Sequence, residues 1–160
     1  MTTSLFRPLA AIALAVASAA AVCQFEPVEE AVDPFDPDPF YISTGFDRTG
    51  TAAVNLACRP GVGWRMQMWF IERDFDDFAG VRFKLDGSDP FDAEGFRVVR
   101  SDHGAGFEKF FQDPVDVQTI ARSKELGVRT YDIRDRTVTA WFSTRGLTEA
   151  LATLKTKCNL

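Results

Sequence analysis

Hydrophobic and polar residues alternate with a period of two along much of the chain after residue 40. Apolar side chains occupy positions 64, 66, 68 and 70, and the run 81–85 alternates in the same way. Successive side chains of a strand point to opposite faces of a sheet, so this pattern predicts half-buried β-strands. We expect strands at 40–44, 52–58, 64–70, 81–85, 96–100, 107–111, 128–133 and 138–142.

Turn signals separate these runs and make an antiparallel arrangement the natural expectation. Asp86-Gly87 has the chemistry of a tight hairpin turn, and a glycine-rich loop spans residues 101–106. Many short strands at even spacing are typical of a sandwich or of a strongly bent sheet.

A helical period replaces the alternation in two places. Asp113-Pro114 has the features of a helix start, and Gly127 is a suitable stop for that helix. A second helix is expected to begin near Gly146, with apolar residues on one face as far as Cys158. The predicted fold class is therefore mainly β (α+β): an antiparallel β-sandwich-like sheet with two short helices, one of them C-terminal.

The first residues form a different kind of segment. A run of small and apolar residues from Leu9 to Val22 follows Arg7, and Ala19-Ala20-Ala21 offers the small-x-small pattern that signal peptidase requires. The run is shorter than the ~20 residues that span a bilayer as a helix. Residues 1–21 therefore predict a bacterial signal peptide, export to the periplasm or the extracellular space, and no transmembrane span in the mature protein. The alternative is an alanine-rich buried core helix.

Residues 22–40 read as an acidic, proline-rich leader. Its four prolines favour an extended tether, because each removes a backbone donor and restricts its predecessor. A docking peptide anchored by Phe35 is the alternative. Cys23 also stands at the position where a bacterial lipoprotein is acylated, so a lipid anchor on this thiol is an alternative to a free or intermolecular cysteine. The remaining residues, 41–160, are predicted to form a single β-rich domain.

The other two cysteines predict a disulfide within that domain. Cys58 falls on the inward face of its strand, and Cys158 falls on the apolar face of the C-terminal helix. Exported proteins mature in an oxidising compartment, where such a bridge persists. Two independent buried thiols are the alternative.

The charge distribution bears on the partners. The chain has a formal net charge of −5, and the acidic excess is concentrated in the leader, so basic and acidic residues are equal in number from residue 41 onward. Composition therefore reveals no basic face, and we expect neither nucleic acid nor an anionic membrane as a partner.

No arrangement of residues in the sequence points to catalysis. His103 is the single histidine, and its neighbours Ser101 and Asp102 are too close in sequence to form a triad with it. The carboxylates around Asp74 and Asp86 lack the ligand spacing and glycine of a calcium loop. We therefore expect no catalytic residues, no metal and no cofactor. A small hydrolase that uses paired carboxylates is the alternative.

Aromatic residues offer a candidate contact surface instead. Phe75, Phe78 and Phe91 lie in acidic segments, where a core position is less assured than for the other phenylalanines. If exposed together, they would form an apolar contact patch ringed by charge.

Residues 41–160 resemble the small periplasmic proteins associated with type VI secretion, of the TagO or VasI kind, and related uncharacterised exported proteins. The resemblance rests on the strand ending in Cys58, the 64–70 strand, the motif at 81–87, the Asp113-Pro114 helix start, the 126–129 motif and, above all, the ending at 140–158. It implies a signal peptide, a β-rich body with two cysteines, and no catalytic residues. The function expected from it is that of a non-enzymatic accessory or binding protein that contacts an envelope or secretion-system protein. An invasion-associated exported protein, resembling the locus B family, is a further alternative.

Overall fold

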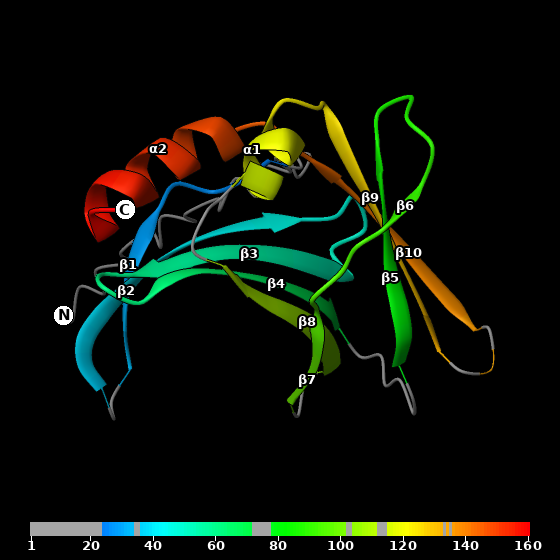
Figure 1. Cartoon of the computed structure of the whole chain (residues 1–160), viewed down its shortest axis with the longest axis horizontal. Coiled ribbons are helices and arrows are strands. Elements are labelled where there is room, and N and C mark those ends of the chain that lie inside the picture. The colour runs from blue at the N-terminus through cyan, green and yellow to red at the C-terminus, as the bar shows by residue number, and fades with distance from the viewer. Residues whose placement is uncertain are drawn as a thin grey trace, which may run out of the picture.

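The computed structural model describes residues 24–33, 36–71, 78–101, 104–111, 115–132, 134 and 136–160. The fold is mainly β, with two antiparallel sheets and two helices, as the pattern of the sequence predicts (Figure 1). The larger sheet has the order β1 (Glu29–Asp33), β2 (Asp36–Phe46), β3 (Ala52–Arg59), β4 (Gly63–Ile71), β8 (Gly104–Phe111) and β7 (Arg97–Ser101). The smaller sheet has the order β10 (Thr137–Ser143), β9 (Glu125–Asp132), β5 (Phe78–Leu85) and β6 (Phe91–Asp92). The helices are α1 (Val115–Ala121) and α2 (Leu147–Cys158).

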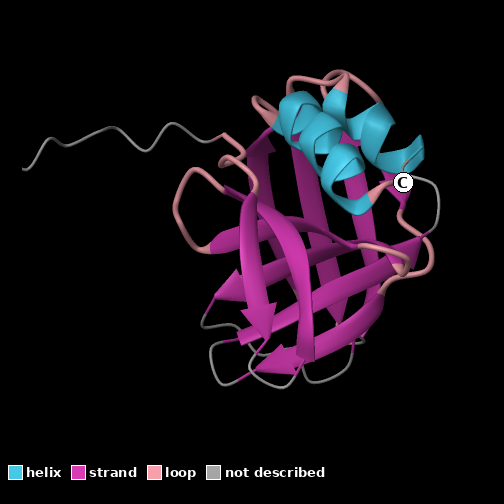
Figure 2. Ribbon diagram, turned by 90° about the vertical axis from the view of Figure 1, so that its left-hand side faces the viewer, coloured by secondary structure: helices cyan, strands magenta, loops and turns pink. Residues whose placement is uncertain are grey.

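The chain passes between the two sheets several times. It leaves the six-stranded sheet after β4, forms β5 and β6, and returns for β7 and β8 before α1 leads it to β9 and β10. Both helices lie over the same face of the six-stranded sheet, and the four-stranded sheet stands at one end of that sheet (Figure 1). The helices pack beside each other, and α2 also contacts β2 and β3 (Figure 2).

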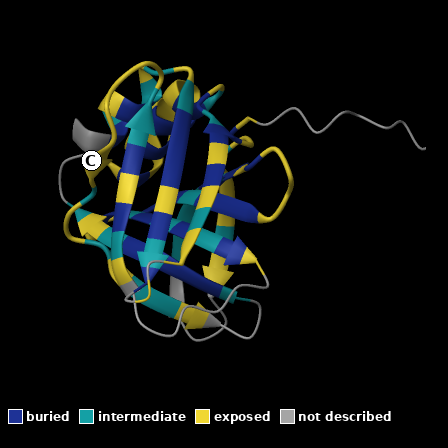
Figure 3. Ribbon diagram, turned by 90° about the vertical axis from the view of Figure 1, so that its right-hand side faces the viewer, coloured by how far each residue is buried: buried dark blue, intermediate teal, exposed yellow. Residues whose placement is uncertain are grey.

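The alternation of the sequence determines which side chains become core. In β4 the residues at 64, 66, 68 and 70 are buried, whereas Arg65, Gln67 and Trp69 are half-buried on the other face. Buried and exposed residues alternate in the same way along other strands (Figure 3). The core between the two sheets and the helices includes Val54, Leu56, Met68, Phe70, Phe107, Val81, Leu126, Val128, Phe142, Leu151 and Leu154.

The predicted disulfide is confirmed. Cys58 lies near the end of β3 and Cys158 is the last residue of α2, and their sulfur atoms are bonded. The two Cα atoms are 6.2 Å apart, within the range that a disulfide accepts. The bridge ties the C-terminal helix to one end of β3, an interior strand of the larger sheet.

The prediction of a tether at residues 22–40 is wrong for the part of it that the structure describes. Glu29–Asp33 and Asp36–Phe46 form the antiparallel pair β1 and β2, so the sheet continues across the predicted boundary at residue 40. Phe25 is buried and belongs to the core, and its N–H donates to the carbonyl oxygen of Arg145 at 2.8 Å. Pro37 and Pro39 lie in β2, which pairs with β3 only from Tyr41 onward, so at these prolines one side of the strand is an open edge, where a missing donor is tolerated.

The first helix is shorter than expected. It ends at Ala121, where the Ser123 hydroxyl and backbone N–H both donate to the Ile120 carbonyl oxygen, at 2.6 and 3.0 Å. Strand β9 then begins at Glu125, so Gly127 belongs to a strand and does not end the helix. The pattern of the sequence also missed β6, a strand of two residues.

Several sequence-based predictions concern residues outside the described part of the chain. They include the signal peptide at 1–21, the acylation of Cys23, the Phe35 anchor, Phe75, the carboxylates of Asp74, Asp76 and Asp77, and His103. Among the described helices, none is long and apolar enough to cross a membrane.

Two buried carboxylates hold tight turns together. Asp47 accepts hydrogen bonds from the Thr49 hydroxyl and from the backbone N–H groups of Thr51 and Ala52, at 2.6, 2.8 and 2.9 Å. Asp132 accepts from the N–H of Arg134 and from the N–H and Nε of Arg136, at 2.9, 3.0 and 2.6 Å. Burial alone would raise the pKa of each carboxyl, but the hydrogen bonds together outweigh burial and lower each pKa below the ordinary value of 3.8.

These shifts predict a loss of stability in acid. Because the folded pKa is depressed, the stabilisation is fully present above the unfolded pKa and is lost as the pH falls through the folded pKa. We expect the free energy of unfolding to decline as the pH falls below about 4. Asp47→Asn should make that decline shallower, because the amide keeps one acceptor oxygen but cannot be protonated in this range. Denaturant titrations at several pH values measure both slopes, and equal slopes for the two proteins would contradict this role of Asp47.

Candidate functional site

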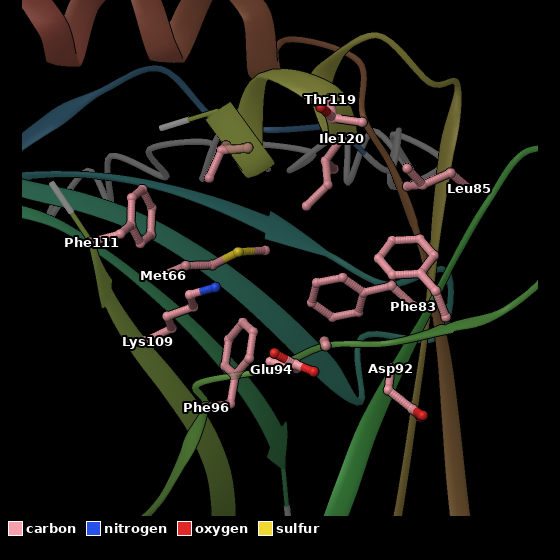
Figure 4. Close-up of a pocket in the computed structure, with 13 residues that line it drawn as sticks. Met66, Phe83, Leu85, Asp92, Glu94, Phe96, Lys109, Phe111, Thr119 and Ile120 are labelled. Carbon is pink, nitrogen blue, oxygen red and sulfur yellow. The ribbon is translucent and has the colours of Figure 1, made fainter. Parts of the chain in front are cut away.

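The main candidate site is a cleft between the two sheets, beneath helix α1. Its volume is about 360 Å³, which is at the lower end of the range for small-molecule sites. Most of its lining is apolar and comes from both sheets and from α1 (Figure 4). The apolar lining residues are Met66, Phe83, Leu85, Phe91, Ala93, Phe96, Phe111, Val117 and Ile120.

Phe83 organises the aromatic part of this cleft. Its ring meets those of Phe91 and Phe96 edge to face, with centroids 6.0 and 5.7 Å away. Such T-shaped pairs bring the positive edge of one ring to the negative face of another. Phe83 is buried, whereas Phe91 is 45% exposed, so the cluster extends from the core to the surface.

The short strand β6 brings Phe91 to this position. The backbone pairs Phe91 with Phe83 and Asp92 with Arg82, and the Ala93 N–H donates to the Val81 carbonyl oxygen at 2.8 Å. Arg82 Nε also donates to Asp92 Oδ1 at 2.8 Å. The chain between β5 and β7 is therefore attached to the edge of the smaller sheet and forms one wall of the cleft.

Lys109 breaks the alternation of β8 at the opposite wall. The buried Phe107 and the cleft-lining Phe111 point to the inner face, and the same period places Lys109 on that face, paired with Met66. The Lys109 ammonium lies 5.9 Å from the centroid of the Phe96 ring, where the ring face attracts a cation. In Figure 4 this ammonium points toward the space between Met66 and Phe96.

Carboxylates complete the rim. Asp92 and Glu94 line the cleft and are exposed. Asp86, which belongs to the same acidic stretch of the sequence, has a structural role: its carboxylate accepts from the backbone N–H groups of Lys124 and Glu125 at 2.9 and 3.0 Å. It thereby attaches the turn after β5 to the start of β9.

The predicted contact patch is only partly described. Phe91 lies at the mouth of the cleft, and Phe75 lies outside the described residues. Phe78 begins β5, five residues before the partner of Phe91, so roughly 16 Å of strand separates the two backbone positions. The joint patch stays a prediction, and the structure associates Phe91 with the cleft instead.

The cleft itself was not visible as a site in the sequence. Met66, Phe83, Phe111 and Ile120 follow the periodicity of core residues, and nothing in a periodic pattern distinguishes a core position from the wall of a cleft. Lys109 was the one residue whose pattern could have indicated the cleft. A charged residue at an inward-facing position is rarely buried without a partner, so it indicates a nearby opening to solvent or a partner.

The described residues contain no group of three or more histidine, cysteine or acidic side chains that could hold a metal ion. Fold and cleft together define a disulfide-linked protein of two antiparallel sheets with an open, aromatic-lined cleft. No family model, no curated protein and no solved structure matches this chain.

Proposed function

We propose that this protein is an exported, non-enzymatic binding protein, and that its cleft receives apolar side chains of a protein in the cell envelope. The observation that carries the proposal is the continuous apolar lining from Phe91 at the surface to Phe83 and Ile120 in the interior. A confined apolar pocket that buries an anchoring side chain is the usual centre of a protein–protein contact.

The charged rim supports a protein as the occupant. Lys109 on one side and Glu94 on the other offer both signs of charge around an apolar centre, which is the usual anatomy of such an interface. A volume of about 360 Å³ suits a few apolar side chains better than a large lipid.

The Cys58–Cys158 bridge supports export, because structural disulfides persist in oxidising compartments and are rare in the cytosol. The apolar start of the chain, read as a signal peptide, and the resemblance to secretion-associated periplasmic proteins favour the envelope as the place of contact. The type VI secretion machinery is the partner class that this resemblance suggests.

Photocrosslinking in living cells tests the proposal. A photoreactive residue at Phe91 should capture the same envelope protein in every replicate. The matched control is a photoreactive residue at Val62, which is 57% exposed and does not line the cleft. The substitution Ala93→Trp, which fills the cleft with an indole, should abolish the capture at Phe91, and Ala152→Trp on the exposed face of α2 should preserve it.

Two outcomes would contradict the proposal. One is capture that persists at Phe91 in the Ala93→Trp variant, because the contact would then not depend on the cleft. The other is capture of lipid alone, which would make the occupant an acyl chain.

A further inference from the structure

The outer face of the four-stranded sheet carries a second hollow, on the far side of β5 from the core. It has a volume of about 270 Å³. Among the described residues that line it, three are cationic, one carries an indole and none is a carboxylate. The lining residues that the argument uses are Arg82, Lys84, Arg129, Thr139 and Trp141.

The pairing of the strands brings these side chains together. Trp141 pairs with Gly127, which pairs with Lys84, so the indole and the ammonium group come from one row across the sheet. Thr139 pairs with Arg129, which pairs with Arg82 in the next row. Acids and bases are equal in number from residue 41 onward, so composition conceals this face, whereas the strand period places these cations on the same side of the sheet.

Gly127 determines how the indole lies. A Cβ on Gly127 would be 2.7 Å from Cζ3 and 2.9 Å from Cη2 of Trp141, so the ring covers the place that a side chain would take. One side of the Trp141 ring packs against Gly127. Trp141 nevertheless remains 38% exposed, which leaves a flat aromatic surface open to solvent beside the cations.

The arginines are positioned by neighbouring side chains. Arg129 Nε donates to Thr139 Oγ1 at 3.0 Å, and Arg82 lies 5.6 Å from the centroid of the Tyr131 ring while it donates to Asp92. Guanidinium groups have several donors, so each arginine keeps N–H groups for an anion after these contacts. Asp92 is the carboxylate next to this face, and Arg82 pairs with it.

We infer that this hollow binds an acidic glycan, a chain of sugar rings that carry carboxylate or phosphate groups. A sugar ring has an apolar C–H face that packs on a flat aromatic ring, and its edges carry polar groups. Trp141 offers the flat ring, and Lys84 and Arg129 lie where an acidic substituent of a stacked sugar can reach them. Arginine binds carboxylate and phosphate through two parallel hydrogen bonds.

A single-stranded nucleic acid uses related chemistry, since bases stack on aromatic rings and phosphates pair with cations. Such binding relies on successive exposed rings along a groove. Here Trp141 is the exposed ring, whereas Tyr131 is packed against Gly80 and beneath Arg82. The arrangement therefore favours a glycan. This inference does not depend on the apolar cleft, which lies on the other side of β5.

Calorimetric titration of the purified chain tests the inference with defined probes: an oligogalacturonate, its neutral methyl ester, a phosphorylated oligomannose and an oligothymidylate. We expect binding to the oligogalacturonate, to the phosphorylated oligomannose or to both. The neutral ester should bind at least about tenfold more weakly, because it keeps the rings but lacks the charge.

Variants locate the binding. Trp141→Ala, and separately the double substitution Lys84→Gln/Arg129→Gln, should each weaken it at least about tenfold. The double substitution Lys155→Gln/Lys157→Gln on α2 removes the same charge elsewhere and should leave it within about twofold. The cleft variant Ala93→Trp should also leave it unchanged.

Three results would overturn the inference: no binding of either acidic glycan, equal binding of the neutral ester, or tighter binding of oligothymidylate through the same residues. Unchanged affinity in the Lys84→Gln/Arg129→Gln protein would also exclude this face as the site, even if Trp141→Ala failed to fold.

Discussion

Replacing both Cys58 and Cys158 by serine is expected to lower the free energy of unfolding by about 4 kcal/mol. The bridge closes a loop with a sequence separation of 100 residues, and its removal restores conformational freedom to the unfolded chain. It also releases the end of α2, whose buried residues Leu151 and Leu154 belong to the core. Guanidinium unfolding, with and without reductant, measures the difference.

The matched control is Cys23→Ser, which should leave stability unchanged because the bridge joins the other two cysteines. Reduced wild-type protein should then resemble the double-serine variant. A change below about 1 kcal/mol in the double variant would mean that α2 stays docked without the bridge, contrary to the role assigned to it.

Phe25→Ala is expected to lower the free energy of unfolding by about 3 kcal/mol. The ring of Phe25 is buried and lies against Gly45, where a Cβ would be 3.0 Å from Cε2 of the ring. Phe25 also donates its N–H to Arg145, just before α2 begins, and so connects the start of the described chain to the C-terminal part. Truncation to alanine leaves a cavity where these parts meet.

Phe110→Ala is the control for this substitution. Phe110 is 52% exposed on the outer face of the larger sheet, so its removal should cost less than about 1 kcal/mol. If Phe25→Ala had as small an effect as Phe110→Ala, residues before β1 would be a tether after all.

The strands were predictable where one face meets the core and the other meets solvent. In β4 and β5 the period of two follows this asymmetry directly. The strand period places Cys58 on the inner face of β3, and the helical period places Cys158 on the apolar face of α2. The sequence did not predict β1, because the segment around it is rich in proline and carboxylates. Both kinds of residue have a low intrinsic propensity for strands. Pairing with β2 and the burial of Phe25 overrode that propensity, and both depend on contacts that the local sequence does not encode.

The two candidate sites could not be predicted from the sequence, because each depends on how separate segments are placed in the folded chain. Phe83 belongs to the core by its period, and only the path of residues 91–96 beside it opens a cleft at its ring. Lys84, Arg129 and Trp141 are distant in sequence and become neighbours through the order β10-β9-β5 of the smaller sheet. Strand alternation predicts the face on which each one lies, but it cannot predict which strands pair.

If both proposals hold, the two faces of the smaller sheet bind different partners. Its inner face contributes Phe83 and Leu85 to the cleft, and its outer face contributes Arg82 and Lys84 to the basic hollow. An envelope protein held on one side and an acidic glycan on the other would fix the protein between two components of the envelope.

The affinity of the purified chain for the envelope protein captured at Phe91 tests the central claim most directly. The account predicts that Ala93→Trp weakens this affinity at least about tenfold at an unchanged melting temperature, while Ala152→Trp stays within about twofold of the wild type. Equal affinity of the wild type and of the stably folded Ala93→Trp variant would contradict it, because a filled cleft could not then be where the partner binds.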